Sequence, residues 1–402
     1  MDVIAGGNVC APRGFRAAGA LGGIKAESTK LDVALVASDR VASAAAVYTT
    51  NRVQAAPLHL CREYLQDGKA QAVILNSGNA NACTGERGLD NARAMSVQVG
   101  RGLGVQSEDV LVCSTGVIGV QLDMDSVQNG IVGVLTSLRE DGGDEAAVAI
   151  MTTDTVPKTG AISLEIGEDT VCVGGMAKGS GMIAPNMATM LGVITTDANV
   201  PPDLLREMLL SAVKRSFNCI TVDGDMSTND TVIALANGAV GGAPLEPNTS
   251  SAAALSEAIE VVCRDLARQI ARDGEGATKL VSIEVTGATS EEEARQVGLS
   301  VANSNLVKTA VFGRDPNWGR ILCAMGYAGV PMDPQQVAVY LCGTQIYGAG
   351  SGLPFDHGAL VEAMSAADIP ISIDLASGNV RTEIFTCDLS YDYVRINAEY
   401  TT

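Results

Sequence analysis

The sequence predicts a mixed α/β protein, because strand-like and helix-like patterns alternate along the chain. Short runs rich in valine, isoleucine and leucine recur, which is typical of strands buried in a sheet. Between them lie longer segments whose apolar residues recur at spacings of three and four. Such spacings indicate helices with one buried face.

The expected strands are short and rich in residues that favour a sheet. They cover residues 32–37, 72–75, 110–113, 191–195, 281–285, 337–341 and 371–373. A first helix begins at Pro201 and Pro202, since proline is tolerated in the first helical turn. Its buried face is predicted to consist of Leu205, Met208, Leu209, Ala212 and Val213.

A second, longer helix is predicted from about residue 251 to residue 272. Its apolar face is made by Leu255, Ile259, Val262, Leu266 and Ile270. The run Gly274-Glu275-Gly276 ends it, because glycine is a common helix terminator. Strands resume after this helix, so we expect a core domain at residues 1–280 and a smaller α/β domain at 281–402.

Composition and charge exclude several classes of protein. The 402 residues carry a formal net charge of −19, which repels nucleic-acid phosphates. No apolar run approaches the roughly 20 residues that cross a membrane, and the first residues lack the apolar stretch of a secretory signal. The ten cysteines form no CxxC pair, so we expect reduced core residues rather than a metal site. A cytoplasmic protein without nucleic-acid or membrane partners is expected.

The scarcity of histidine restricts the possible catalytic bases. The chain has two histidines, His59 and His357. His59 lies among apolar residues and His357 precedes a helix-like run, so structural roles are favoured for both. A Ser-His-Asp or Cys-His site would need one of them. If the protein is an enzyme, we expect its base to be another group.

Residues 176–191, MAKGSGMIAPNMATML, carry the densest signal. Lys178 precedes the glycines, which excludes the phosphate-binding loop that Lys-Gly-Ser-Gly first suggests. A flexible loop followed by Ala188, Thr189 and a strand suits self-cleavage before Thr189. The threonine hydroxyl would attack the Ala188 carbonyl, and hydrolysis would leave Thr189 as a new N-terminus. A threonine that merely starts a buried strand is the alternative.

A new N-terminus would supply the missing base. A free α-amine titrates near pH ~8, so at neutral pH it can accept a proton. It could take the proton of the Thr189 hydroxyl directly or through one water. Thr189 would then be both nucleophile and carrier of its own base.

Several ordered motifs resemble those of the ornithine acetyltransferase family, the bifunctional glutamate N-acetyltransferases. The clearest is the segment from Lys178 to Leu191, followed by GVITTDA. The others are GGIK at 22–25, NSGNANACTG at 76–85, STGVIG at 114–119, MTTDT at 151–155, VDGDMSTND at 222–230, GEGATK at 274–279, DPNWGR at 315–320 and INAEYTT at 396–402. The resemblance extends over nearly the whole chain.

The resemblance implies a fold and a set of site residues. The fold is a self-processing αββα-type sandwich of two sheets with a second, smaller α/β domain. Thr115 and Gly116 would stabilise the oxyanion of the transition state. The implied substrate contacts are Thr152, Lys178, Thr189, Glu275, Asn397 and Thr402. Lys178 suits a carboxylate, Glu275 suits an ammonium or a proton transfer, and the last two imply that the C-terminal tail folds into the site.

Some assignments within these motifs stay open. Thr152 and Thr153 are adjacent in one motif, so either could be the substrate contact. Asp223, Asp225 and Asp230 lack the spacing of a calcium-binding loop, and structural turns are favoured over a metal site. Trp318 could either pack in the core or line the site.

The expected activity is transfer of acetyl from N-acetyl-L-ornithine to L-glutamate in arginine biosynthesis, through an acetyl ester of Thr189. The resemblance implies an α chain of residues 1–188, a β chain of residues 189–402 and an α2β2 assembly. It implies no metal and no tightly bound cofactor, with acetyl-CoA as a second donor in bifunctional members. Two alternatives remain: a self-processing aminopeptidase or amidase, and an unprocessed amino-acid-binding protein.

Overall fold

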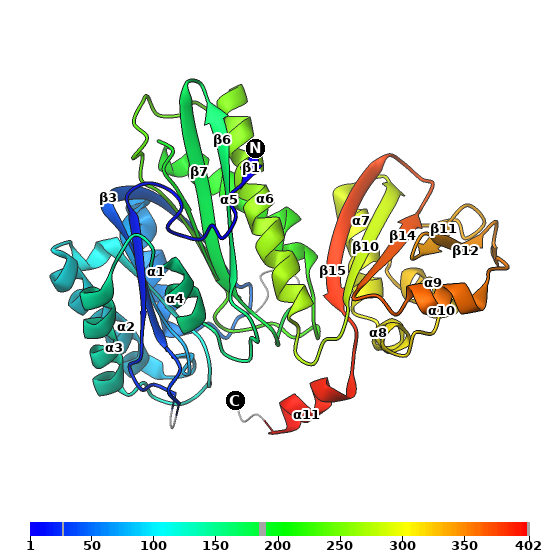
Figure 1. Cartoon of the computed structure of the whole chain (residues 1–402), viewed down its shortest axis with the longest axis horizontal. Helices are drawn as coiled ribbons and strands as arrows, with labels where there is room; N and C mark the ends of the chain where they lie inside the picture. The colour runs from blue at the N-terminus through cyan, green and yellow to red at the C-terminus, as the bar shows by residue number, and fades with distance from the viewer. Residues whose placement is uncertain (26–27, 185–189, 400–402) are drawn as a thin grey trace.

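The computed structural model describes residues 1–25, 28–184 and 190–399. Its strands are β1 (Asp2–Val3), β2 (Phe15–Ala20), β3 (Val33–Tyr48), β4 (Lys69–Asn76), β5 (Val110–Ser114), β6 (Lys158–Ile166), β7 (Asp169–Lys178), β8 (Leu191–Thr196), β9 (Thr231–Ala236), β10 (Leu280–Ala288), β11 (Ala338–Leu341), β12 (Thr344–Gly348), β13 (Ser351–Gly352), β14 (Asp368–Asp374) and β15 (Val380–Cys387). They form two separate sheets, which lie side by side in Figure 1.

The α-helices alternate with these strands. They are α1 (Ala56–Tyr64), α2 (Gly85–Leu103), α3 (Met124–Ser137), α4 (Gly143–Ala149), α5 (Pro202–Arg215), α6 (Ser250–Arg272), α7 (Glu291–Ala302), α8 (Asn305–Phe312), α9 (Trp318–Gly326), α10 (His357–Ala363) and α11 (Tyr391–Glu399). Short 3-10 helices are η1 (Leu65–Asp67), η2 (Ser107–Asp109) and η3 (Phe217–Cys219). The mixed α/β class predicted from the alternating patterns is confirmed.

The first sheet runs in the order β1-β6-β7-β8-β9-β3-β4-β5, and β2 also pairs with β3. The long strand β3 divides its partners between its two halves. Its first half pairs with β2 and β4, the pairing with β4 continues to Ser43, and residues from Ser43 to Tyr48 pair with β9. The register with β4 shifts between Ala37 and Ala42, where β3 passes from one half of the sheet to the other. The strand therefore joins two layers into one hydrogen-bonded sheet.

Three buried clusters separate the layers of this part of the molecule. Side chains of β4 and β5, such as Val73 and Leu111, share one cluster with Val193 of β8 and Ile233 of β9, so the two halves of the sheet face each other. A second cluster packs α2 and α3 on the outer face of β3, β4 and β5. A third packs α5 and α6 on the other outer face. The resulting layers are helices, one half of the first sheet, its other half, and helices again. This is the αββα sandwich that the resemblance implies, and its two sheet layers are the two halves of the first sheet, joined through β3.

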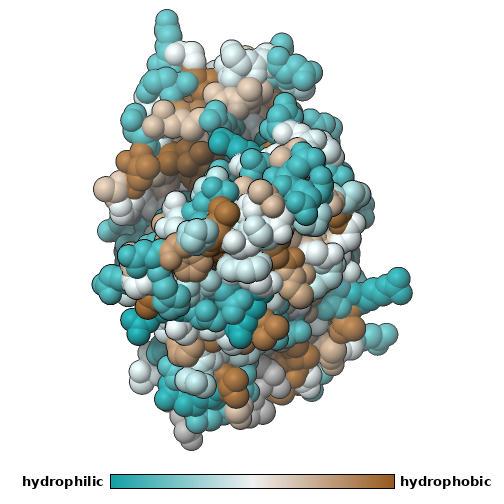
Figure 2. Space-filling view, turned by 90° about the vertical axis from the view of Figure 1, so that its right-hand side faces the viewer, coloured by the Kyte–Doolittle hydropathy of each residue, from teal (hydrophilic) through white to brown (hydrophobic). Residues whose placement is uncertain are grey.

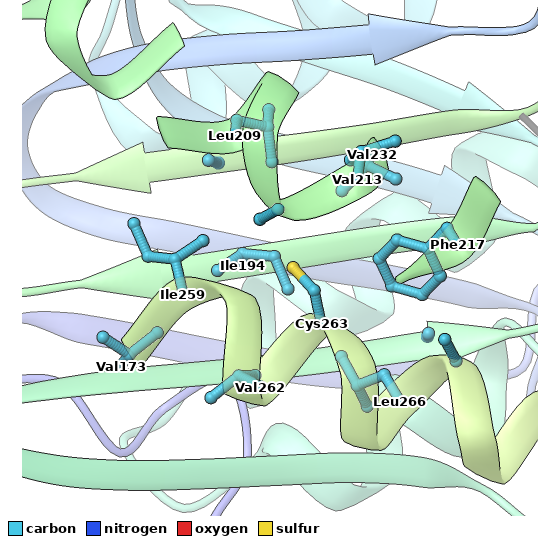
Figure 3. Close-up of a cluster of buried hydrophobic side chains, with 14 of the residues drawn as sticks. Val173, Ile194, Leu209, Val213, Phe217, Val232, Ile259, Val262, Cys263 and Leu266 are labelled. Carbon is cyan, nitrogen blue, oxygen red and sulfur yellow. The ribbon is translucent and has the colours of Figure 1, made fainter. Parts of the chain in front are cut away.

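Periodicity in the sequence predicted the two helices of the third cluster. In Figure 3, Leu209 and Val213 of α5 and Ile259, Val262, Cys263 and Leu266 of α6 lie together over the strands. Thr249 caps the start of α6, because its hydroxyl accepts a hydrogen bond from Ala252 N at 3.2 Å. The helix ends at Arg272, directly before the segment that carries Glu275.

The second sheet has the order β13-β12-β11-β14-β10-β15 and packs with α7, α9 and α10 around its own buried cluster. The strand of this sheet that comes first in the sequence, β10, begins at Leu280. Trp318 of α9 is partly buried and packs against this cluster, with its ring centroid 5.7 Å from that of Tyr347. Trp318 thus packs on the core of the second sheet and does not line the pocket described below.

Helix α6 connects the two sheets through ionic contacts. Arg264 pairs with Glu383 of β15, and Arg268 and Arg272 both pair with Asp368 of β14. Because these three arginines are four residues apart, they lie on one stripe of the helix. Figure 2 shows that the face on the side of the second sheet mixes hydrophilic and hydrophobic residues. Within the described ranges, no helix has the length and hydropathy needed to cross a membrane.

Candidate active site

A pocket collects most of the residues that the sequence singled out. It lies where β7 ends, beside the loops that follow β5 and α6. Its walls are Ala80, Thr115, Gly116, Ile118, Thr152, Thr153, Lys178, Gly181, Met182, Ser227, Asn229, Glu275 and Asn397. Six predicted site residues are therefore brought together: Thr115, Gly116, Thr152, Lys178, Glu275 and Asn397. Ala188, Thr189 and Thr402 lie outside the described residues.

Thr115 and Gly116 directly follow β5 and are held against the loop after β4. Thr115 N donates to Asn76 O at 2.9 Å. Gly116 has a φ of +130°, and a Cβ there would lie 2.3 Å from the carbonyl carbon of Gly78. Only glycine can occupy this position without displacing that backbone. Among the described residues, neither the Gly116 N–H nor the Thr115 hydroxyl has a hydrogen-bond acceptor, so both donors are available to a ligand in the pocket.

The Asn/Gly-rich loop at 76–85 supports this pair through side-chain amides. Asn76 Oδ1 accepts from the Ser114 hydroxyl at 2.6 Å, and Asn76 Nδ2 donates to Asn79 O at 2.9 Å. Asn229, on the opposite side, donates to Ala80 O at 2.6 Å and to Ser114 O at 2.8 Å. The loop is therefore fixed from both sides, which holds the donors after β5 in place.

Lys178 is the last residue of β7, and its side chain is only 3% exposed. Its Nζ lies 3.9 Å from Asp154 Oδ2. Burial lowers the pKa of the Lys178 ammonium from its ordinary value, and the nearby carboxylate of Asp154 opposes that shift. The site thus contains a buried cation with an anionic partner behind it.

Asp154 belongs to a buried ionic cluster behind the pocket wall. Lys158 Nζ lies 2.6 Å from Asp154 Oδ1 and also pairs with Asp273. Burial alone would raise the pKa of the Asp154 carboxyl, but Lys178 and Lys158 hold that pKa well below its ordinary value. Asp154 is therefore an anion at neutral pH.

Thr152 and Thr153 lie between α4 and β6, and both line the pocket. Thr152 N donates to Asp154 Oδ2 at 2.9 Å. One residue earlier, Met151 O accepts from Lys25 Nζ at 2.8 Å. Lys25, from the GGIK motif, therefore helps to fix this segment. Because both threonines line the pocket, the choice between Thr152 and Thr153 stays open.

Glu275 follows the end of α6, and its backbone N donates to Ser180 O at 3.0 Å. Its carboxylate accepts from Asn397 Nδ2 at 2.7 Å. A Cβ on Gly181 would lie 2.2 Å from Glu275 Cδ, so the glycine leaves the space that this carboxylate occupies. Asn397 belongs to α11, which follows β15 and runs back toward the first sheet (Figure 1). The C-terminal helix thus delivers a polar side chain to the pocket.

Both flanks of the segment 185–189 are fixed by aspartates of the motif at 222–230. Asp223 accepts from Met182 N at 2.6 Å and from Ile183 N at 2.9 Å. Asp230 Oδ1 accepts from Met190 N at 3.0 Å, next to Thr189 in the sequence. Burial raises the pKa of both carboxyl groups. These two aspartates organise the backbone on either side of the expected cleavage point.

Several residues of the pocket region were not selected from the sequence as functional, and four of them take part in the geometry described above. Asn229, Ser227 and Gly181 line the pocket, and Asp154 lies behind it. All four stand inside motifs that carry the family resemblance. The sequence could not show which of these residues face the pocket, because turns and buried ion pairs depend on contacts between distant segments. Neither histidine lines the pocket: His59 lies on α1, and His357 begins α10.

Comparison with known proteins agrees with the motifs. The model of the ArgJ family matches residues 16–402. The chain is 51% identical over 403 residues to the "Arginine biosynthesis bifunctional protein ArgJ" of Symbiobacterium thermophilum, and the match covers 100% of both chains. It is 47% identical over 400 residues to the protein of the same name from Caldanaerobacter subterraneus, covering 98% of this chain and 99% of that protein.

A solved structure also resembles this chain. The arginine biosynthesis bifunctional protein argJ of Bacillus halodurans superposes with a TM-score of 0.51 at 42% identity. The match covers 98% of that solved chain but 52% of this one. The solved chain therefore corresponds to about half of the sequence.

Proposed function

The chain belongs to the ArgJ family, and we propose that it transfers the acetyl group of N-acetyl-L-ornithine to L-glutamate in arginine biosynthesis. The observation that carries this proposal is the pocket itself. It combines a buried ammonium, a carboxylate and two free hydrogen-bond donors beside the start of β8. The full-length likeness to proteins named for arginine biosynthesis supports the choice of substrates.

The charged groups of the pocket suit an α-amino acid. Lys178 would bind the α-carboxylate as a buried ammonium. Glu275, held by Asn397, would bind an ammonium group of the substrate or assist a proton transfer. Because N-acetyl-L-ornithine and L-glutamate both carry an α-carboxylate, Lys178 could bind the donor and the acceptor in turn, whereas an ammonium partner for Glu275 is present on the side chain of the donor.

Thr189 is proposed as the nucleophile after cleavage of the Ala188–Thr189 bond. Cleavage would give an α chain of residues 1–188 and a β chain of residues 189–402. The α-amine released on Thr189 would serve as its base, which agrees with the absence of histidine from the described pocket wall. The solved chain of the Bacillus halodurans relative matches about half of this sequence. A cut near the middle of the sequence would give two products of about that length.

The proposed transfer has two balanced halves. The Thr189 hydroxyl oxygen bonds to the acetyl carbon while its proton moves to the Thr189 α-amine. The acetyl–nitrogen bond then breaks, that proton passes to the departing nitrogen, and ornithine leaves an acetyl ester behind. The neutral amine of glutamate attacks the ester, its proton returns to the threonine oxygen, and N-acetylglutamate leaves.

Thr115 and Gly116 would bind the oxyanion in both halves. The Thr115 hydroxyl and the Gly116 N–H have no acceptor among the described residues, and both positions are fixed by the loop at 76–85. Donors held in this way stabilise charge that develops in the transition state, and each typically contributes on the order of 10²–10³ in rate.

The proposal extends to partners and location. It needs small-molecule substrates and no metal or tightly bound cofactor, with acetyl-CoA as a candidate co-substrate. The two products of cleavage would stay together as an α2β2 heterotetramer in the cytoplasm. These parts of the proposal rest on the family resemblance.

Purified protein tests the function directly. Incubation with N-acetyl-L-ornithine and L-glutamate is expected to yield ornithine and N-acetylglutamate in equal amounts. A parallel reaction with acetyl-CoA and glutamate tests the second donor. Release of free acetate without N-acetylglutamate would instead indicate the amidase alternative. A chain that binds amino acids but neither cleaves itself nor releases ornithine would indicate the binding-protein alternative.

A further inference from the structure

The buried cluster of Lys158, Asp154 and Asp273 lies outside the pocket but contacts three of its segments. Lys158 has no exposed side-chain surface, and neither has Asp154. Such a group of charges is costly to bury unless every member is paired. Lys158 pairs with both aspartates, and Asp154 has a second cation, Lys178, at 3.9 Å. The four charges therefore cancel.

Asp154 connects two walls of the pocket through its two carboxylate oxygens. Oδ1 accepts from Lys158 Nζ at 2.6 Å and from Gly179 N at 2.7 Å. Oδ2 accepts from Thr152 N at 2.9 Å and lies 3.9 Å from Lys178 Nζ. One buried carboxylate thus holds the backbone beside Thr152 and the backbone that follows Lys178.

Asp273 connects the same cluster to the third wall. It pairs with Lys158 and accepts from Thr155 N at 2.9 Å. Its own carbonyl accepts from the Ser180 hydroxyl at 2.6 Å, two residues before Glu275. Removal of any one charge of the cluster would therefore disturb several parts of the pocket.

The distance between Asp154 and Lys178 has a chemical consequence. At 3.9 Å the two groups attract each other, but no direct hydrogen bond is formed. Because Lys158 holds Oδ1, the carboxylate does not need Lys178 as a hydrogen-bond donor. The three N–H groups of the Lys178 ammonium remain available for a substrate carboxylate.

We propose that Asp154 is a positioning residue for Lys178 and that, through this contact, it sets the preference of the pocket for a free α-carboxylate. The inference rests on the proposed function, in which Lys178 binds that carboxylate. The charged groups that face Lys178 are Asp154, Lys158, Asp230, Glu275 and Lys25. Of these, Asp154 is the carboxylate paired with it in the structure.

The test compares two ligands that differ only in the group that Lys178 would bind. Binding of L-ornithine and of its α-carboxamide is measured by calorimetry on the purified full chain. The wild type is expected to prefer the carboxylate by at least about tenfold, as loss of a hydrogen bond to a charged group predicts. Asp154→Asn is expected to abolish most of that preference, and Asp154→Glu, which keeps the charge, to retain part of it.

Asp197→Asn is the matched control. Asp197 is also buried and accepts from the backbone, from Cys172 N at 2.8 Å, but it lies at the opposite end of β7 from Lys178. The control should keep the wild-type preference. Equal weakening of both ligands in Asp154→Asn would overturn the inference and leave only a structural role. So would a wild type without preference.

A second readout uses pH. With the carboxylate at 154 removed, Lys178 loses the anion that opposes the effect of burial on its pKa. Affinity for L-ornithine falls when the pH rises far enough to deprotonate Lys178. In Asp154→Asn this fall should therefore begin at a lower pH than in the wild type. An unchanged pH profile would count against the proposal. Because binding is measured without turnover, these outcomes are independent of acetyl transfer. Failure of the wild type to transfer acetyl would contradict the proposed function instead.

Discussion

Asn397 Nδ2 donates a hydrogen bond to Glu275 Oε2 at 2.7 Å, although 122 residues separate them in the sequence. The contact joins the C-terminal helix to the segment after α6. It also places a neutral donor on the carboxylate that is proposed to bind the substrate. The last turn of α11 is thereby part of the pocket.

Replacement of Asn397 by alanine tests this contact. Glu275 would lose a donor that orients its carboxylate, so KM for N-acetyl-L-ornithine should rise by roughly tenfold, in keeping with a hydrogen bond to a charged group. Steady-state kinetics measure the effect. Val394→Ala, on an exposed position of the same helix, should behave as the wild type. Equal effects of the two changes would mean that only the position of the helix matters.

The small size of Gly181 is predicted to be essential. A methyl group there would lie 2.2 Å from Glu275 Cδ, closer than side chains pack. Gly181→Ala should displace the carboxylate and weaken substrate binding by more than tenfold, with calorimetry of ornithine binding as the measurement. Gly326→Ala, at the end of α9, has open space around the new methyl group and serves as control. Wild-type affinity in Gly181→Ala would refute the placement of Glu275.

Loss of the Thr115 hydroxyl should slow the chemical step more than it weakens binding. Thr115→Ala removes one proposed oxyanion donor, and kcat should fall by about 10²–10³ with little change in the affinity for ornithine. Thr115→Ser keeps the hydroxyl and should recover most of the rate. A serine variant as slow as the alanine variant would contradict the role of the hydroxyl.

Removal of Lys158 from the ionic cluster behind the pocket should lower the free energy of unfolding. Lys158→Met would leave two buried carboxylates with a single cation, at a cost of about 3–5 kcal/mol in the free energy of unfolding. Denaturant titration measures the loss. Lys69→Met, at an exposed position, should change stability by less than about 0.5 kcal/mol.

The same cluster predicts a pH dependence with a defined sign. The folded pKa of Asp154 is held below its unfolded value of about 3.9, so its ion pairs stabilise the protein fully above that value. This contribution disappears as the pH falls through the folded pKa. The stability difference between the wild type and Lys158→Met should therefore be largest near neutral pH and should shrink below pH ~4. A difference independent of pH would contradict the assignment.

The sequence predicted elements whose patterns are regular. Helices α5 and α6 follow from spacings of three and four, and the expected strands coincide with parts of β3, β4, β5, β8, β10, β11 and β14. The strands that were not expected are β1, β2, β6, β7, β9, β12, β13 and β15. Two of them, β7 and β9, lie in the middle of the first sheet. β9 is buried on both faces, and β7 contains Gly174 and Gly175, so neither shows a simple alternation.

The site could be predicted as a set of residues but not as an arrangement. Family motifs named Thr115, Lys178 and Glu275, and the structure brings these residues into one pocket. The cluster behind them joins Lys158 to Asp273, which are 115 residues apart in the sequence. A buried ion pair of this kind arises only when α6 packs on β6 and β7, and local sequence contains no sign of that packing.

Mass spectrometry of the purified protein after incubation with N-acetyl-L-ornithine alone tests the central claim most directly. The account predicts two fragments, one beginning at Thr189, and an added acetyl group on the Thr189 residue of that fragment. Addition of L-glutamate should remove the acetyl group. Thr189→Ala should remain a single, unmodified chain. A wild-type chain that stays uncleaved, or an acetyl group carried at another residue, would contradict the account.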